Sequence, residues 1–397
     1  MTDNRLLKLC IVTSTRADWG LLSPLAAELR RRPKVQLQIV ATNMHLTERY
    51  GYTVDEIIAD GFSVDARVPL DIADDSEASR ARAMATCAAG MADAFSSLAP
   101  DAVIILGDRY EMLSVASVAA VMRLPIVHIS GGEVTLGAVD DCLRHAITKL
   151  SALHLTATEV YRRRVIQMGE QPTAVVNCGA LGVWNAMHQP LPTEDALRAE
   201  LGIEPNVPLA VVTYHPVTLD DESPAVRMQA MLDALDRFAD LHCIITYPNN
   251  DARSQQLIDM LQRYAETHSD RVTLVKSLGM RRYLAAVKAA RVVIGNSSSG
   301  VVEVPSTGTP TVDIGPRQQG RVAAASVIHC DDGADNIAAA IERALSAEHQ
   351  QLSAACDNPY AREDTPTVMA DTILRFMADR PIPPKQFYDL PYMPENI

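Results

Sequence analysis

A group of acidic side chains with two basic neighbours falls between residues 108 and 145 of the sequence. The acidic members are Asp108, Glu133, Asp140 and Asp141, and Arg144 and His145 lie one turn into the helix predicted from residue 140. Carboxylates that share one site push their pKa values apart, which lets one serve as an acid and another as a base. Each of them alone is also a common helix cap or salt-bridge partner. As a group they predict acid–base catalysis.

A second candidate site follows the short β-branched run at 291–294. The run breaks at a Gly-Asn pair and leads into a predicted helix over 301–306, and the polar residues around this turn and after the next strand are Ser297, Ser298, Glu303, Arg317 and Arg321. Open N–H groups and the dipole at a helix start bind anions, and Glu303 is placed to reach a ribose diol. Serines that only cap a helix are the alternative. Two successive strand ends with anion-binding groups favour a nucleotide site.

Alternating strands and helices position both groups. Apolar strands are predicted at 7–14, 35–41, 102–106, 126–129, 153–156 and 174–178, and a second series runs from a strand at 209–213 to a helix at 335–347. This alternation predicts parallel sheets covered by helices on both faces. Functional groups in such sheets follow the strand ends. The candidates found there are Arg16, His45, Asp108, Arg109, His215, Asn249 and Ser277.

A proline-rich stretch at 190–192, with further prolines at 205 and 208, separates the two series and predicts a linker. We expect an N-terminal Rossmann-like domain over residues 1–182, with residues 366–397 packing back on it, and a C-terminal Rossmann-like domain over 183–365. The predicted fold class is α/β, with the two domains facing across a ligand-binding cleft and a C-terminal helix that returns to the N-terminal domain.

The composition argues against several other classes of protein. The 397 residues carry a formal net charge of −13, which is unfavourable for binding nucleic acid or an anionic membrane. No apolar run has the roughly 18 residues of a membrane span. The seven cysteines are scattered without a CxxC pair, as in a reducing compartment, and we expect a cytoplasmic protein. No metal-ligand spacing, GxGxxG or GxSxG motif occurs, so we expect neither a metal nor a cofactor.

Several segments, in a fixed order, resemble one family. They are TSTRAD at 13–18, NMHLTERYG at 43–51, LGDRYE at 106–111, the run from GGEVTLGAVDD at 131 to 155, HPVT at 215–218, YPNND at 247–251, and IGNSSSGVVEVPSTGTP with GPRQQGR up to 321. Over about residues 7–380 the chain is similar to the hydrolysing UDP-N-acetylglucosamine 2-epimerases of bacterial sialic-acid synthesis and their relatives. The resemblance implies a fold like that of GT-B glycosyltransferases, with the sugar at the catalytic N-terminal domain and the nucleotide of the UDP-sugar substrate held mainly by the C-terminal half. It also implies a homodimer or homotetramer.

The resemblance also implies a reaction that needs no nicotinamide. A base removes the proton at C2 of the sugar, UDP leaves by anti elimination to give a 2-acetamidoglucal, and water adds to release N-acetylmannosamine. Matched by motif, Asp108 and Asp140 are catalytic carboxylates, and Arg109 and His45 lie in active-site loops. The residues matched to the nucleotide are Arg16, Ser297, Ser298, Arg317, Glu303 on the ribose, and His215 and Asn249 in the same pocket. We also expect Glu133 and His215 to act in catalysis, and Ser277 and Arg144 to contact the UDP-sugar.

One departure from the family pattern keeps the substrate open. Many members that form N-acetylmannosamine carry Glu immediately before the Gly-Gly pair, where this chain has Ser130, so the C2 base is not assigned. UDP-N-acetylglucosamine is the first expectation. A UDP-linked 2,4-diacetamido-2,4,6-trideoxy sugar, used on the way to legionaminic acid, is the second. A GT-B glycosyltransferase, a non-hydrolysing epimerase and a nucleotide-sugar sensor are the remaining alternatives.

Overall fold

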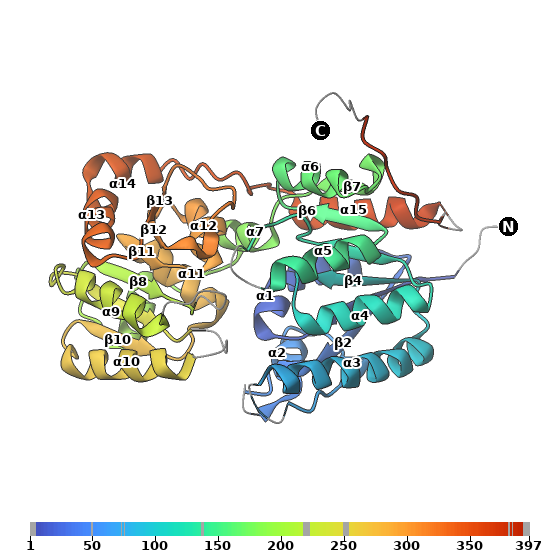
Figure 1. Cartoon of the computed structure of the whole chain (residues 1–397), viewed down its shortest axis with the longest axis horizontal. Helices are drawn as coiled ribbons and strands as arrows, with labels where there is room; N and C mark the ends of the chain where they lie inside the picture. Colours follow the sequence, from blue (N-terminus) through green and yellow to red (C-terminus); the bar gives the residue numbers. More distant parts are fainter. Residues whose placement is uncertain are drawn as a thin grey trace. The chain divides into compact units, whose positions relative to one another are not determined.

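The chain folds into two compact units, each built around one parallel sheet (Figure 1). The structure, a computed structural model, describes residues 5–48, 51–72, 74, 76–135, 139–216, 223–248, 254–379, 382 and 384–391. The N-terminal unit takes the described residues of Met1–Glu133, Asp140–Leu181 and Arg362–Ile397, and the C-terminal unit those of Val134–Val139 and Gly182–Ala361. The predicted α/β class with two Rossmann-like domains is confirmed. No helix of the described chain is long and apolar enough to cross a lipid bilayer.

The N-terminal sheet has the strand order β3-β2-β1-β4-β5-β6-β7. Its described strands are β1 (Leu7–Thr13), β2 (Val35–Thr42), β3 (Ala66–Val68), β4 (Ala102–Leu106), β5 (Ile126–Ile129), β6 (Leu153–Thr156) and β7 (Val175–Asn177), and all pairs are parallel. Parallel strands buried on both faces read as continuous apolar runs, which is why most of them were predicted. No strand was predicted at β3, whose three residues include the polar Arg67.

Helices cover both faces of this sheet, and the strand side chains alternate between two core layers. One layer joins Leu9 and Ile11 of β1 to helices α1 (Arg16–Arg30) and α15 (Thr365–Ala378). The other layer joins the residues in between, Cys10 and Val12, to α3 (Glu77–Leu98) and α4 (Tyr110–Val121). The period of two is that of a strand. The prediction that the last helix returns to the N-terminal domain is confirmed, since α15 packs against α1.

The remaining helices of the N-terminal unit are short. They are α2 (Val54–Ala59), α5 (Asp140–Leu150) and α6 (Glu159–Gln167), with single helical turns η1 (Asn43–Leu46) and η3 (Pro172–Ala174). Among them, α5 begins with the two aspartates of the predicted acidic group.

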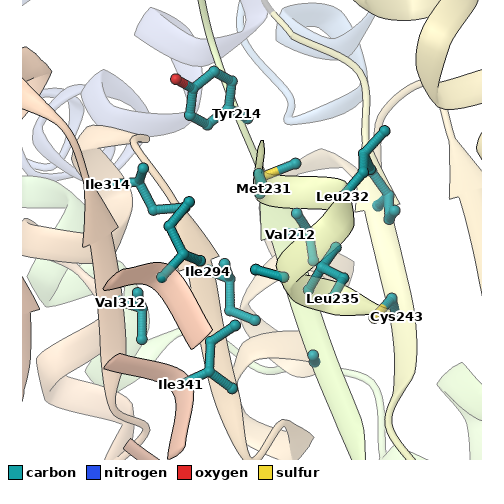
Figure 2. Close-up of a cluster of buried hydrophobic side chains, with 14 of the residues drawn as sticks. Val212, Tyr214, Met231, Leu232, Leu235, Cys243, Ile294, Val312, Ile314 and Ile341 are labelled. Carbon is teal, nitrogen blue, oxygen red and sulfur yellow. The ribbon is translucent and has the colours of Figure 1, made fainter. Parts of the chain in front are cut away.

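The C-terminal sheet has the order β10-β9-β8-β11-β12-β13, again with parallel pairs. Its described strands are β8 (Leu209–Thr213), β9 (His242–Thr246), β10 (Val272–Val275), β11 (Val292–Gly295), β12 (Thr311–Ile314) and β13 (Val327–Cys330). Figure 2 shows one core layer, where Val212, Ile294 and Val312 of three neighbouring strands meet Leu235 of α9 and Ile341 of α13.

The helices around this sheet are α7 (Leu181–His188), α8 (Glu194–Leu201), α9 (Pro224–Leu235), α10 (Ser254–Thr267), α11 (Gly279–Ala289), α12 (Ser298–Val302), α13 (Ala334–Leu345) and α14 (Ala347–Ser353), with the turns η4 (Val304–Thr307) and η5 (Pro316–Gln318). Helix α9 ends at Leu235, and the N–H groups of Arg237 and Phe238 donate to carbonyls only three residues back. The helix expected over 301–306 is divided at Glu303 into α12 and η4.

The described tail at 384–391 is fastened to the N-terminal unit by a buried charge. The Nζ of Lys385 donates to the carbonyls of Lys149 and Ser151, both at 2.7 Å, and lies 2.7 Å from a carboxylate oxygen of Glu170. That carboxylate is 2% exposed and also meets Lys149 and His154. Burial alone raises the pKa of Glu170, but the hydrogen bonds from His154 and the two lysines outweigh it and lower the pKa to about 2. The tail therefore binds at the C-terminal end of α5, the helix that begins at Asp140.

Replacing Glu170 tests how much this cluster stabilises the unit. Glu170→Gln leaves Lys149 and Lys385 without their shared anion, and removing one partner of a buried ion pair costs about 3 kcal/mol of unfolding free energy. Urea unfolding at pH 7 measures the loss. Glu159→Gln is the matched control, because Glu159 is 47% exposed in its pairs with Arg162 and Arg163, and surface pairs contribute under about 1 kcal/mol. Equal losses for the two variants would show that the cluster contributes no special stability.

Candidate active site at the carboxyl ends of the strands

The loop after β1 is built by a helix cap. Thr15 is the N-cap of α1 and accepts from the N–H of Asp18, while Asp18 accepts from the main chain of Thr15 at 3.1 Å and from the hydroxyl of Ser14 at 2.6 Å. Burial raises the pKa of Asp18 against the lowering effect of Arg109. Arg16 starts the helix with its side chain 41% exposed and 3.7 Å from Glu56. The predicted phosphate ligand Arg16 therefore lies on a rigid helix start at this sheet edge.

A buried arginine holds two carboxylates of the acidic group. Arg144, on α5, has a side chain only 3% exposed; its Nη2 donates to Asp108 and its Nη1 to Asp141 at 3.1 Å. Asp108 follows β4 and keeps 23% of its side chain exposed. The structure thus brings Asp108, Asp141 and Arg144 together, with Asp140 at the first position of the same helix. Arg144, which the sequence predicts to contact the substrate, orients the Asp108 carboxylate in this structure.

Glu133 lies at the end of the loop after β5 and is partly buried. The loop leaves the strand through Ser130, which has a φ of 66° and donates from its N–H to the carbonyl of Leu155. Gly132 follows at a φ of 78°, and a Cβ there would lie 2.5 Å from the carbonyl oxygen of Tyr161. Only glycine fits that approach, so the Gly-Gly pair of the motif has a steric reason.

Glu111 was not predicted as a site residue, but it organises Arg109. Its carboxylate is fully buried and accepts from Nε of Arg109 at 2.7 Å and from Nδ2 of Asn43 at 2.8 Å. Burial raises the pKa of Glu111, and the charge and hydrogen bond of Arg109 together with that of Asn43 outweigh it, so the pKa is lowered. Glu111 and Asp18 in turn raise the pKa of Arg109 despite burial. One carboxylate in the otherwise apolar helix α4 was the signal available in the sequence.

Two histidines near these loops are buried and have both ring nitrogens hydrogen-bonded. His45 lies between the hydroxyls of Thr13 and Thr53, at 3.0 and 2.9 Å. His128 lies between the hydroxyl of Thr148 and the carbonyl of Gly107, at 3.1 and 2.8 Å. Burial lowers the pKa of His45 to about 4 and that of His128 to about 3. Both are neutral at pH 7 and fix the loops that begin at Asn43 and Asp108.

In the C-terminal unit, the residues after β8, β11 and β12 meet. Asn296 is fully buried directly after β11; its side-chain amide binds the main chain of His215, and its carbonyl accepts from Arg317 at 3.1 Å and from Gln318 at 2.8 Å. Burial, with the charge of Arg317, lowers the pKa of His215 to about 3. The predicted residues His215 and Arg317 are therefore neighbours, although 102 positions separate them.

Other predicted nucleotide ligands of this unit also follow strand ends at this edge of the sheet. Ser297 is the N-cap of α12, Ser298 is exposed at its first position, and Glu303 is partly buried where α12 ends. Ser277 is exposed after β10, and its hydroxyl accepts from the N–H of Gly279 at 3.2 Å. Asn249 lies outside the described residues.

Glycines shape the two turns that carry these groups. Gly295 has a φ of 139°, and a Cβ there would lie 1.9 Å from the carbonyl oxygen of Thr213. Gly315, at a φ of 74°, would place a Cβ 2.1 Å from Asp332, whose carboxylate pairs with Arg227 at 2.9 Å. Neither turn accepts a side chain. In the described residues no group of three or more His, Cys, Asp or Glu side chains is arranged to hold a metal ion.

Comparison with known proteins identifies one family throughout. The sequence profile of the family described as UDP-N-acetylglucosamine 2-epimerase matches residues 27–374. The GDP/UDP-N,N'-diacetylbacillosamine 2-epimerase (hydrolyzing) of Campylobacter jejuni is 37% identical over 383 residues, 96% of this chain and 99% of that protein. The UDP-N,N'-diacetylbacillosamine 2-epimerase (hydrolyzing) of Legionella pneumophila is 35% identical, over 85% of this chain and 89% of its own.

A relative with a different named substrate is slightly less similar. The UDP-N-acetylglucosamine 2-epimerase of Neisseria meningitidis is 32% identical over 85% of this chain and 87% of that protein. Among solved structures, a UDP-GlcNAc 2-epimerase from Neisseria meningitidis bound to UDP-GlcNAc superposes with a TM-score of 0.80 at 16% identity, covering 93% of this chain and 100% of the other. At that identity the superposition shows a shared fold.

The buried imidazole of His45 predicts a loss of stability in mild acid. The pKa of His45 is lowered from 6.5 to about 4, so the unfolded chain binds a proton that the folded chain does not. The contribution of the neutral His45 to the unfolding free energy is complete above pH 6.5. It is lost as the pH falls to about 4, a change of about 3 kcal/mol. In a plot of unfolding free energy against pH, His45→Gln should reduce the slope in this window by the equivalent of up to one bound proton. Equal slopes for variant and parent, from urea unfolding between pH 7.5 and 4.5, would contradict the assignment.

Proposed function

The chain belongs to the UDP-N-acetylglucosamine 2-epimerase family, as its motifs predicted, and we propose that it is a hydrolysing 2-epimerase that releases a free, 2-epimerised acetamido sugar and UDP from a nucleotide sugar. Members of this family are enzymes that act on nucleotide sugars. The observation that carries the hydrolysing activity is full-length similarity to two relatives named as hydrolyzing 2-epimerases, at 37% and 35% identity.

We place UDP-N,N'-diacetylbacillosamine before UDP-N-acetylglucosamine as the substrate, which reverses the order of the sequence analysis. The two relatives named for the diacetylated sugar are 37% and 35% identical to this chain, and the relative named for UDP-N-acetylglucosamine is 32% identical. Ser130, in place of the Glu expected before Gly-Gly, fits a change of sugar. The GDP-linked sugar belongs in the same comparison, because the Campylobacter jejuni relative is named for both nucleotides.

The proposed reaction moves one proton and breaks one C–O bond in its first half. A carboxylate takes the C2 proton, the C1–O bond to UDP breaks, and a 2-acetamidoglucal forms. In the second half, water supplies the hydroxyl at C1 and a proton returns to C2 from the opposite face. Asp108 and Asp140 are the proposed acid–base pair, with Glu133 as a further candidate. Arg144 supports this role for Asp108, since its buried guanidinium fixes the direction of the carboxylate.

The departing diphosphate needs positive charge and N–H donors that are already in place. In the C-terminal unit we assign Arg317, Ser297 and Ser298 to the phosphates and Glu303 to the ribose, with His215 and Ser277 lining the pocket. In the N-terminal unit we assign Arg16 and Arg109. The buried Glu111 supports Arg109 in this role by holding its Nε at 2.7 Å, which leaves the guanidinium in one orientation.

Product analysis tests the activity directly. Incubated in D2O with each nucleotide sugar, the enzyme should release free 2-epimerised sugar carrying deuterium at C2, together with UDP, as seen by proton NMR. Faster turnover of the diacetamido substrate supports our choice, and faster turnover of UDP-N-acetylglucosamine overturns it. A UDP-linked epimer alone identifies a non-hydrolysing epimerase. Binding without turnover of any of these sugars favours a glycosyltransferase or a sensor.

Substitution of Asp108 tests catalysis separately from nucleotide binding. Asp108→Asn should lower kcat by about 10²–10⁴-fold, since it removes an acid–base group, and should leave the Kd for UDP unchanged. Asp141→Asn is the matched control, because Asp141 is the other carboxylate on Arg144, and it should lower kcat by less than about 10-fold. Similar losses in the two variants would mean that Asp108 acts only as a partner of Arg144.

A further inference from the structure

Asn296 occupies the point where three strand ends of the C-terminal unit converge. It follows β11 directly, lies between Gly295 and the serines of α12, and its side chain is fully buried. A buried polar side chain in a protein interior is retained where its hydrogen bonds are satisfied. The hydrogen-bond partners of Asn296 must therefore explain why its polar side chain is buried.

The side-chain amide of Asn296 binds both main-chain groups of His215. Its Oδ1 accepts from the N–H of His215 at 2.7 Å, and its Nδ2 donates to the carbonyl of the same residue at 2.8 Å. Its own N–H donates to the carbonyl of Thr213 at 3.2 Å. The amide thus extends the pairing of β11 with β8 by two residues beyond the last paired strand position, Gly295 with Thr213.

Among side chains of this length, only asparagine presents this pattern. Asn presents a donor and an acceptor side by side, as a peptide edge does. Aspartate would place a second acceptor against the carbonyl of His215, and an aliphatic residue would leave both main-chain groups of His215 without their partner. The turn at Gly295, with its φ of 139° and no room for a Cβ, brings the amide of Asn296 back over the end of β8.

The main-chain carbonyl of Asn296 holds the third strand end. It accepts from Nη1 of Arg317 at 3.1 Å and from Nε2 of the buried Gln318 at 2.8 Å. Both donors lie in the turn η5 after β12. One residue therefore fixes the backbone at His215 through its side chain and the guanidinium of Arg317 through its carbonyl.

We propose that Asn296 is a positioning residue of the nucleotide site: it sets His215 and Arg317 at a fixed separation so that together they receive the diphosphate of the substrate. The proposal rests on the proposed function, in which both residues line the UDP site, and it adds the residue that holds them there. Asn296 itself makes no contact with the ligand in this proposal. Its effect on affinity passes through these two residues.

The first experiment compares Asn296→Ala with a variant that loses a buried hydrogen bond at the opposite edge of the same sheet. Thr309, just before β12, is buried, and its hydroxyl donates to the carbonyl of Val287 at 2.8 Å. Thr309→Val is nearly isosteric and removes only the hydroxyl. Each variant therefore loses buried hydrogen bonds and some thermal stability. By calorimetric titration, Asn296→Ala should raise the Kd for UDP about 10-fold, and Thr309→Val should change it less than about 2-fold. Equal effects would make Asn296 a structural residue only.

The second experiment is a double-mutant cycle with Arg317. Arg317→Ala alone should weaken UDP binding about 10- to 150-fold. In that background, Asn296→Ala should add less than about 3-fold, because one of the two residues it positions is gone. Full additivity overturns the proposal even if both single variants bind UDP poorly.

The measurements separate this proposal from the proposed function. The UDP-binding measurements and the double-mutant cycle do not require turnover. If the protein binds UDP but releases no sugar, the epimerase assignment is contradicted, and the cycle still decides the role of Asn296. A parent protein that does not bind UDP overturns both. Epimerase activity with an additive cycle overturns the positioning role alone.

Discussion

Parallel strand pairing is the constraint on which this molecule depends. In both sheets every described pair is parallel, so each strand must be followed by a crossover that covers the sheet. All strand ends then meet at one edge, and the side chains that follow them come from distant parts of the sequence. Asp108 and Arg144 meet in this way, as do His215, Asn296 and Arg317. The proposed site residues gather at these edges because the rest of each sheet is buried under helices.

Ionisable groups are buried in this molecule in two different ways. The carboxylates of Glu111 and Glu170 are buried in their ionised form, because arginine, lysine and amide donors surround them. The histidines at 45, 128 and 215 are buried in their neutral form, since burial lowers the pKa of each well below 7. Ion pairs therefore fix the directions of carboxylates and guanidinium groups. The neutral imidazoles of His45 and His128 hold their loops through hydrogen bonds without adding charge to an already acidic chain.

Most of the fold was predictable from sequence because the strands are apolar runs separated by helix signals. The strand β3 was not, since three residues with Arg67 among them carry no periodic pattern. The candidate site residues were predictable as side chains that follow strand ends, but their hydrogen-bond partners were not. Whether Asp108 meets Arg144, or Asn296 meets His215, depends on which strands are neighbours in the sheet. His45 was expected in an active-site loop, but its burial between two threonines could not be predicted from the sequence. Asn296 was taken for a strand break, because its role depends on contacts 81 and 21 residues away.

The tail that Lys385 anchors bears on how the chain is assembled during synthesis. Apart from the short segment Val134–Val139, the C-terminal unit is one continuous stretch that is complete once Ala361 has been made. The N-terminal unit, although begun first, still lacks α15 and the lysine that meets Glu170 at that moment. Domains usually fold in the order in which they leave the ribosome. Here the second unit can close its core while the first still exposes the α1 surface, which stays uncovered until α15 has been made.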